Sequence, residues 1–167
     1  SMVAAIPALT TDKAVNLFEK FHIFTKVELE SRAEVLYEGY AKMINIEAQT
    51  MLHMVPKHYI PAVIRFTTEL GASISSVTAA GVDATVQKEL LAKVSALLAK
   101  ASAAKDTLEA VVAETNAIED GCTMANAFHD KVVPAMAALR EPIDELELLV
   151  DKDYWPVPTY GDLMFEV

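Results

Sequence analysis

The sequence predicts an all-α fold, an elongated antiparallel bundle of about four long helices. Apolar residues recur at helical spacing over most of the 167 residues, and no alternating strand pattern of useful length occurs. Alanine, the strongest helix former, supplies much of the 53% hydrophobic content. We expect a short N-terminal helix, kinks at prolines and an extended aromatic tail at the C-terminus.

The N-terminal region should contain one short helix before the bundle. Ser1-Met2 is typical of a cloning remnant, so the helical domain is assigned to residues 3–153. Thr11 or Asp12 can cap the short helix, which should end near His22.

A long helical stretch should follow. Thr25-x-x-Glu28 has the capping-box spacing, in which the hydroxyl and the carboxylate each accept a hydrogen bond from a backbone amide. Helical periodicity then continues to about Ala79. Pro56 and Pro61 each remove an intrahelical hydrogen bond and crowd the carbonyl four residues back, so we expect a kink there.

Two further long helices complete the predicted bundle. Gly81-Val82-Asp83 is the clearest turn signal, Gly121 is the expected break before the last helix, and Pro134 and Pro142 should bend that helix. The third helix carries an unbroken apolar seam at Leu90, Val94, Leu97, Ala101, Ala104, Leu108, Val111, Thr115 and Ile118. The fourth carries Phe128, Val132, Met136, Leu139, Ile143, Leu146 and Val150.

The tail, residues 154–167, differs from the rest of the chain. Pro156 and Pro158 favour extended backbone, Gly161 permits a turn, and the only tryptophan lies here. We expect an extended strap whose aromatic rings dock on the bundle or on another domain. The candidate anchors are Trp155, Tyr160 and Phe165.

Asn45 and Glu47 are polar residues within an apolar helical stretch and are further interface candidates. A hydrogen bond between helices is the first interpretation for both, and contact with a neighbouring domain is the second.

Composition excludes several classes of partner. The net charge of −10 argues against nucleic acid, because phosphate binding needs a concentrated basic surface. No uncharged stretch approaches the roughly 20 apolar residues that span a bilayer. Cys122, the single cysteine, excludes an intrachain disulfide and fits a reducing compartment, so we expect a cytoplasmic protein.

Residues for catalysis or metal binding are few. Glu19 and His22 have the Glu-x-x-His spacing that di-iron bundles use twice, but no second copy occurs, so chance is the better explanation. His53 and His58 should lie about 140° apart around an α-helix, too far apart for a shared metal. Phosphate-binding glycine loops and Gly-x-Ser-x-Gly are absent. The sequence thus predicts no catalytic residue, bound cofactor or metal.

Several segments resemble type III glutamine synthetases, in the same order along the chain. The tail, with its Trp155-Pro156 and Tyr160-Gly161-Asp162-Leu163, is similar to the aromatic, Pro-x-Pro, Tyr-Gly-Asp-Leu ending of that family. Further matches lie at residues 13–20, 44–51, 133–136 and 149–156. The resemblance covers nearly the whole chain and is weakest from about 71 to 127.

This resemblance implies a non-catalytic C-terminal helical domain with a structural or assembly role. Enzymes of the family join ammonia to glutamate using ATP and Mg²⁺ and assemble as stacked hexameric rings. The implied partners are therefore an upstream catalytic domain of the same chain and further copies of it. No catalytic motif of the family matches a position in this sequence.

Two other classes stay open on the residues alone. One is a free-standing helical protein-interaction or sensor module without enzymatic activity. The other is a metal-binding bundle enzyme, supported only by Glu19 and His22. An upstream reading frame that encodes a ligase would favour the domain of a glutamine synthetase. A native start codon would favour the free-standing module, and bound iron or manganese would favour the metal-binding enzyme.

Overall fold

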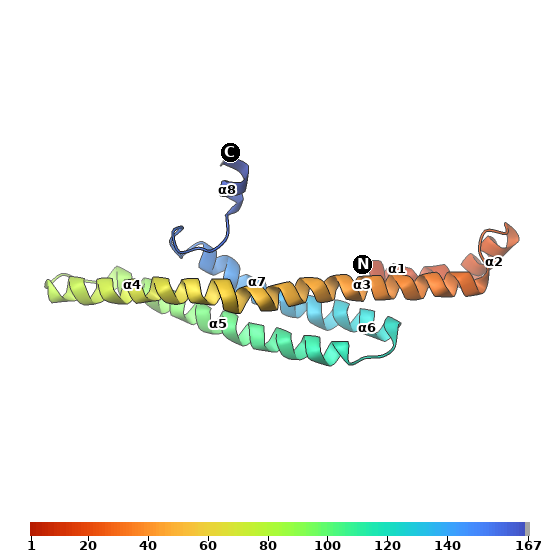
Figure 1. Cartoon of the computed structure of the whole chain (residues 1–167), viewed down its shortest axis with the longest axis horizontal. Helices are drawn as coiled ribbons and strands as arrows, with labels where there is room; N and C mark the ends of the chain where they lie inside the picture. Colours follow the sequence, from red (N-terminus) through yellow and green to blue (C-terminus); the bar gives the residue numbers. More distant parts are fainter. Residues whose placement is uncertain (166–167) are drawn as a thin grey trace. The chain divides into compact units, whose positions relative to one another are not determined.

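The computed structural model describes residues 1–165, and every regular element among them is helical, which confirms the predicted all-α class (Figure 1). The chain forms two compact units. The first comprises Ser1–Thr50 and Leu108–Met136, and the second comprises Met51–Thr107 and Ala137–Val167. None of the helices within residues 1–165 is both long enough and apolar enough to cross a bilayer.

The first unit begins with helical turns that the sequence did not predict. Helix α1 spans Met2–Ala5 and leads into a 3₁₀ turn at Ile6–Thr10. Val3 and Ile6 are buried, and this burial holds the turns in place. That Ser1-Met2 is a cloning remnant stays a prediction.

Helix α2, Asp12–Lys20, is the predicted short helix, and Thr11 caps it as expected. Its end is a Schellman motif, because the Ile23 amide donates to the Phe18 carbonyl at 3.0 Å and the His22 amide donates to the Glu19 carbonyl at 3.0 Å. His22 therefore has a left-handed backbone, with φ of 52°, at a position where glycine is usual.

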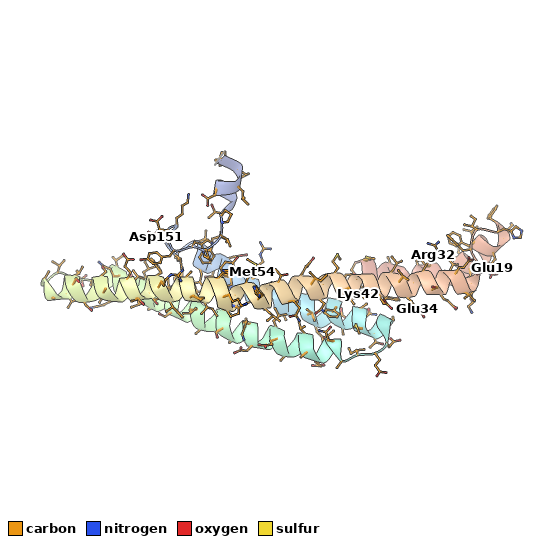
Figure 2. The ribbon with its side chains drawn as sticks, viewed as in Figure 1. Glu19, Arg32, Glu34, Lys42, Met54 and Asp151 are labelled. Carbon is orange, nitrogen blue, oxygen red and sulfur yellow. The ribbon has the colours of Figure 1, made fainter. Side chains whose placement is uncertain are left out.

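Helix α3, Lys26–Met54, starts at the predicted capping box. The Thr25 amide donates to the Glu28 carboxylate at 2.7 Å, and the Glu28 amide donates to the Thr25 hydroxyl at 3.3 Å. The Arg32 guanidinium lies 4.2 Å from the centre of the Phe24 ring. Figure 2 marks Arg32 at this end of α3 and Lys42 further along it.

The expected kink at the prolines takes the form of a π turn. Val55–Tyr59 connects α3 to helix α4, Ile60–Ala79, and the Ile60 amide bonds to the Val55 carbonyl five residues back. One turn of the helix therefore contains an extra residue just before Pro61, and the helix continues instead of breaking there. A wider turn separates the proline ring from the carbonyl that it would otherwise crowd.

Ahead of the tail, the C-terminal half of the chain contains three more helices and a second π turn before a proline. Helix α5, Thr85–Asn116, follows the Gly81 turn, where φ is 76°. Gly121 is not the break that was predicted, since Asp120 caps helix α6, Gly121–Ala127, by accepting from the Thr123 amide at 2.8 Å. A second π turn, Phe128–Val132, then precedes helix α7, Val133–Glu147, whose second residue is Pro134.

The predicted apolar seams supply most of the buried residues of α5 and of the last helices, but Val112 rather than Val111 is buried, and Ile118 lies beyond the end of α5. Val94, Leu97, Ala101 and Leu108 are buried on α5, and Thr115 is buried further along the same helix. In the second unit a core joins Val63 and Phe66 of α4, Val94 and Leu97 of α5, Leu146 of α7, Val150 and Trp155. Three helices and the start of the tail thus share this core.

The tail is extended only in part. Residues 155–159 form no helix, but Tyr160–Phe165 form the short helix α8, drawn in dark blue in Figure 1. The expectation of a fully extended strap is therefore wrong for its second half. Thr159 and Asp162 provide a capping interaction that the sequence analysis overlooked.

Candidate interface at the C-terminal tail

The first half of the tail is fixed to the second unit by Trp155. Its side chain is only 8% exposed, and its ring centre lies 5.1 Å from that of Tyr59. The indole Nε1 is buried and has no hydrogen-bond partner among the described residues. Trp155 therefore contributes through apolar contact rather than through its polar atom.

Tyr154 adds a polar attachment next to it. Its hydroxyl donates a hydrogen bond to the Glu69 carboxylate of α4, and its ring centre lies 5.9 Å from that of Phe66. The hydrogen bond to Glu69, followed by burial, raises the pKa of the Tyr154 hydroxyl. The hydroxyl stays protonated and able to donate at neutral pH.

The N-terminus of α8 is held by a network around Asp162. The Asp162 carboxylate accepts hydrogen bonds from the Thr159 amide at 2.8 Å and from its hydroxyl at 2.9 Å, and it pairs with the Lys152 ammonium at 2.7 Å. The Lys152 contact, then the Thr159 bonds, lower the pKa of Asp162 from 3.8 to about 2. The carboxylate is charged at neutral pH, which suits the positive end of a helix.

Helix α8 presents apolar side chains to solvent. Leu163 is 67% exposed, Met164 68% and Phe165 80%. A capped helix that leaves three consecutive large apolar residues uncovered is an uncommon surface feature, and such patches mark interaction sites.

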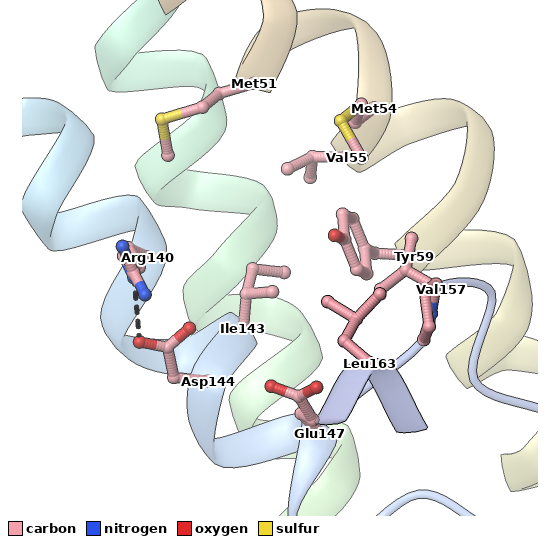
Figure 3. Close-up of a pocket in the computed structure, with 11 residues that line it drawn as sticks. Met51, Met54, Val55, Tyr59, Arg140, Ile143, Asp144, Glu147, Val157 and Leu163 are labelled. Carbon is pink, nitrogen blue, oxygen red and sulfur yellow. Dashed lines mark hydrogen bonds and ion pairs between the residues drawn. The ribbon is translucent and has the colours of Figure 1, made fainter. Parts of the chain in front are cut away.

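A groove of about 390 Å³ lies beside α8 within the second unit. Figure 3 shows Tyr59, Val157 and Leu163 on one side of it and Arg140 and Asp144 on the other. The Arg140 Nε donates to Asp144 at 3.0 Å, so the guanidinium and the carboxylate neutralise each other. Leu163 belongs both to the apolar side of the groove and to the exposed face of α8.

The predicted anchors occupy different environments. Trp155 is buried in its own unit, whereas Phe165 is exposed, and the Tyr160 side chain lies outside the described part of the structure. The Asn45 side-chain oxygen accepts a hydrogen bond from the Asn116 side-chain amide at 3.3 Å. This agrees with the first interpretation of Asn45, a hydrogen bond between helices. Glu47 is exposed, and among the described residues no hydrogen bond from it to another helix is found.

Leu163 and Met164 belong to the exposed face but were missed as interface residues. The signal that could have found them is Thr159-x-x-Asp162, which has the same spacing as Thr25-x-x-Glu28. It predicts a helix start at 160 and hence a shared surface for the three apolar residues after it.

The residues that the sequence analysis considered as metal ligands occupy different environments. Glu19 accepts a hydrogen bond from the Lys26 amide at 3.1 Å, so its carboxylate is engaged at the start of α3. The prediction that His53 and His58 lie on different faces is wrong, because their ring centres are 6.5 Å apart. Within residues 1–165 no group of three or more His, Cys, Asp or Glu side chains is placed to hold a metal ion.

Fold and tail together define an all-α domain that ends in a separately capped helix with an exposed apolar face. Residues 1–78 match the family model described as glutamine synthetase C-terminal domain. This match covers the N-terminal part of the chain.

Three relatives extend the match over most of the chain. A type-3 glutamine synthetase of Dictyostelium discoideum is 28% identical over 171 residues, covering 96% of this chain and 23% of the relative. Glutamine synthetases of Butyrivibrio fibrisolvens and Bacteroides fragilis (strain YCH46) are 27% and 26% identical, covering 97% and 86% of this chain. The chain spans only 20–23% of the length of these three relatives.

Proposed function

We propose that this chain is the non-catalytic structural and assembly domain of a longer type III glutamine synthetase. The longer enzyme would join ammonia to glutamate at the expense of ATP. Its nucleotide and Mg²⁺ would be bound by a catalytic domain upstream. The match to the C-terminal part of glutamine synthetases supports this placement.

The observation that carries the structural role is the exposed face of α8. Leu163, Met164 and Phe165 project from a helix whose start is fixed to the second unit by Asp162 and Lys152. Fully burying an apolar side chain of this size contributes about 1.5–3 kcal/mol. The three together could supply much of the free energy that holds two domains against each other.

The occupant that we assign to this face is the catalytic domain, of the same chain or of another subunit in the ring. The curated relatives have three to four times as much sequence outside the matched part as within it. A large domain is thus available to cover the apolar face. Assembly as stacked hexameric rings would follow from such contacts. Glu47, which is exposed, is a second and smaller candidate for contact with a neighbouring domain.

The reading frame upstream of Val3 provides the first test. It should encode several hundred residues of ligase. A native start codon at that point would instead support a free-standing interaction or sensor module.

Substitution in the full-length enzyme provides the second test. Met164→Ser combined with Phe165→Ser should reduce the oligomer size measured by light scattering, because these side chains would lose their buried contacts. Val86→Ser is the matched control, since Val86 is 75% exposed on α5 but far from α8 in sequence. An unchanged oligomer in the double variant, with circular dichroism also unchanged, would contradict the proposed role of α8.

A further inference from the structure

His53 and His58 lie beside each other because the helix between them is not an ordinary α-helix. His58 lies within the π turn Val55–Tyr59, and His53 lies just before it; the hydrogen bond of the turn joins Ile60 to Val55, five residues back. One extra residue in the turn brings positions five apart onto one face, as positions four apart are in an α-helix. The sequence spacing therefore hides a pair that the fold creates.

The geometry of the pair is close to that of two ligands on one ion. The ring centres are 6.5 Å apart and the ring planes are inclined by 56°. A metal–nitrogen bond to imidazole is about 2.0–2.1 Å, so two rings in adjacent positions on one ion have centres about 5 Å apart. Both side chains are exposed, and a small rotation about their side-chain bonds closes the remaining distance.

We propose that His53 and His58 form a two-imidazole site for a late divalent transition metal, Ni²⁺, Cu²⁺ or Zn²⁺, with water completing the coordination. Neutral imidazole is a preferred ligand of these ions, whereas Mg²⁺ and Ca²⁺ prefer oxygen ligands. This site is thus distinct in its chemistry from the Mg²⁺ sites that the proposed function assigns to the catalytic domain.

A bound ion would clamp the π turn. The two ligands flank Val55, which is buried, and His58 is followed by Tyr59, whose ring lies 5.1 Å from that of Trp155. Ligation by both histidines would stabilise the wide turn against conversion to ordinary helix, because the ion binds the two-ligand geometry best. The fluorescence of Trp155, the single tryptophan, offers a further readout, because its ring contacts that of Tyr59, the residue after His58.

The test is a titration of tag-free protein with NiCl₂ and, separately, ZnCl₂, followed by calorimetry. One ion should bind per chain, and His53→Ala and His58→Ala should each weaken binding at least tenfold. His22→Ala and His129→Ala are the matched controls, since neither residue has another histidine beside it in the described structure, and both should bind as the parent chain does.

A second readout places the ion. Ni²⁺ should broaden the imidazole proton resonances of His53 and His58 before those of His22 and His129. Equal broadening of all four, or binding that survives the His53 and His58 substitutions, would overturn the proposal. Absence of binding below millimolar metal would overturn it as well. None of these outcomes depends on the chain's place in a glutamine synthetase.

Discussion

The two halves of the C-terminal tail use similar residues for opposite purposes. Tyr154 and Trp155 are directed into the second unit, where Trp155 joins a core built by three helices. Only a few residues later, Leu163, Met164 and Phe165 are exposed on α8. An aromatic, apolar tail is therefore not one anchor, because its first half attaches the tail and its second half presents a surface.

The largest effect should come from removing the attachment. Trp155→Ala should lower the free energy of unfolding by about 3–5 kcal/mol, because it leaves a cavity in the shared core. Chemical denaturation measures this change. Trp155→Phe keeps most of the ring and removes the unpaired Nε1 donor, so it should cost much less. An equal decrease in the free energy of unfolding for both variants would show that the indole also stabilises the fold through a contact other than apolar packing.

A smaller, local effect should come from the cap of α8. Thr159→Ala removes the hydroxyl that accepts from the Asp162 amide at 3.2 Å and should destabilise α8 by about 1 kcal/mol. Amide hydrogen exchange of residues 161–165 should speed up, while exchange in α4 should not change. Thr159→Ser keeps the hydroxyl and serves as the control. Faster exchange in α4 as well would mean that the two halves of the tail are not independent.

The smallest effect near neutrality should be that of pH on α8. The pKa of Asp162 is lowered to about 2 in the folded chain, from 3.8. The stabilisation is therefore complete above pH of about 4 and is lost as the pH falls through about 2. A carboxyl titration by NMR should follow Asp162 directly, and Lys152→Ala should move its midpoint upward. A midpoint near 3.8 in the parent chain would contradict the ion pair with Lys152.

Local signals in the sequence predicted much of the fold. Thr11 and the Thr25–Glu28 pair start helices as expected, and Gly81 forms the expected turn, because caps and left-handed glycines depend on a few neighbouring atoms. The seam of α5 was likewise readable from its spacing, since buried positions repeat with the helix period.

Features that depend on a change of helix period could not be read in this way. Both π turns insert a residue, so the proximity of His53 and His58 contradicts what α-helical geometry predicts for residues five apart. The different fates of Trp155 and Phe165 depend on which neighbours are present to cover them, and residue type alone does not specify that.

The π turn at Val55–Tyr59 also sets the rotational phase of α4. Each residue advances an α-helix by about 100°, so deleting one residue from this turn would swing Val63 and Phe66 by that angle away from Leu146 and Trp155. Five residues in the turn therefore decide which side of the following twenty-residue helix is inward, and a shortened homologue would need a newly patterned α4 to keep the same core.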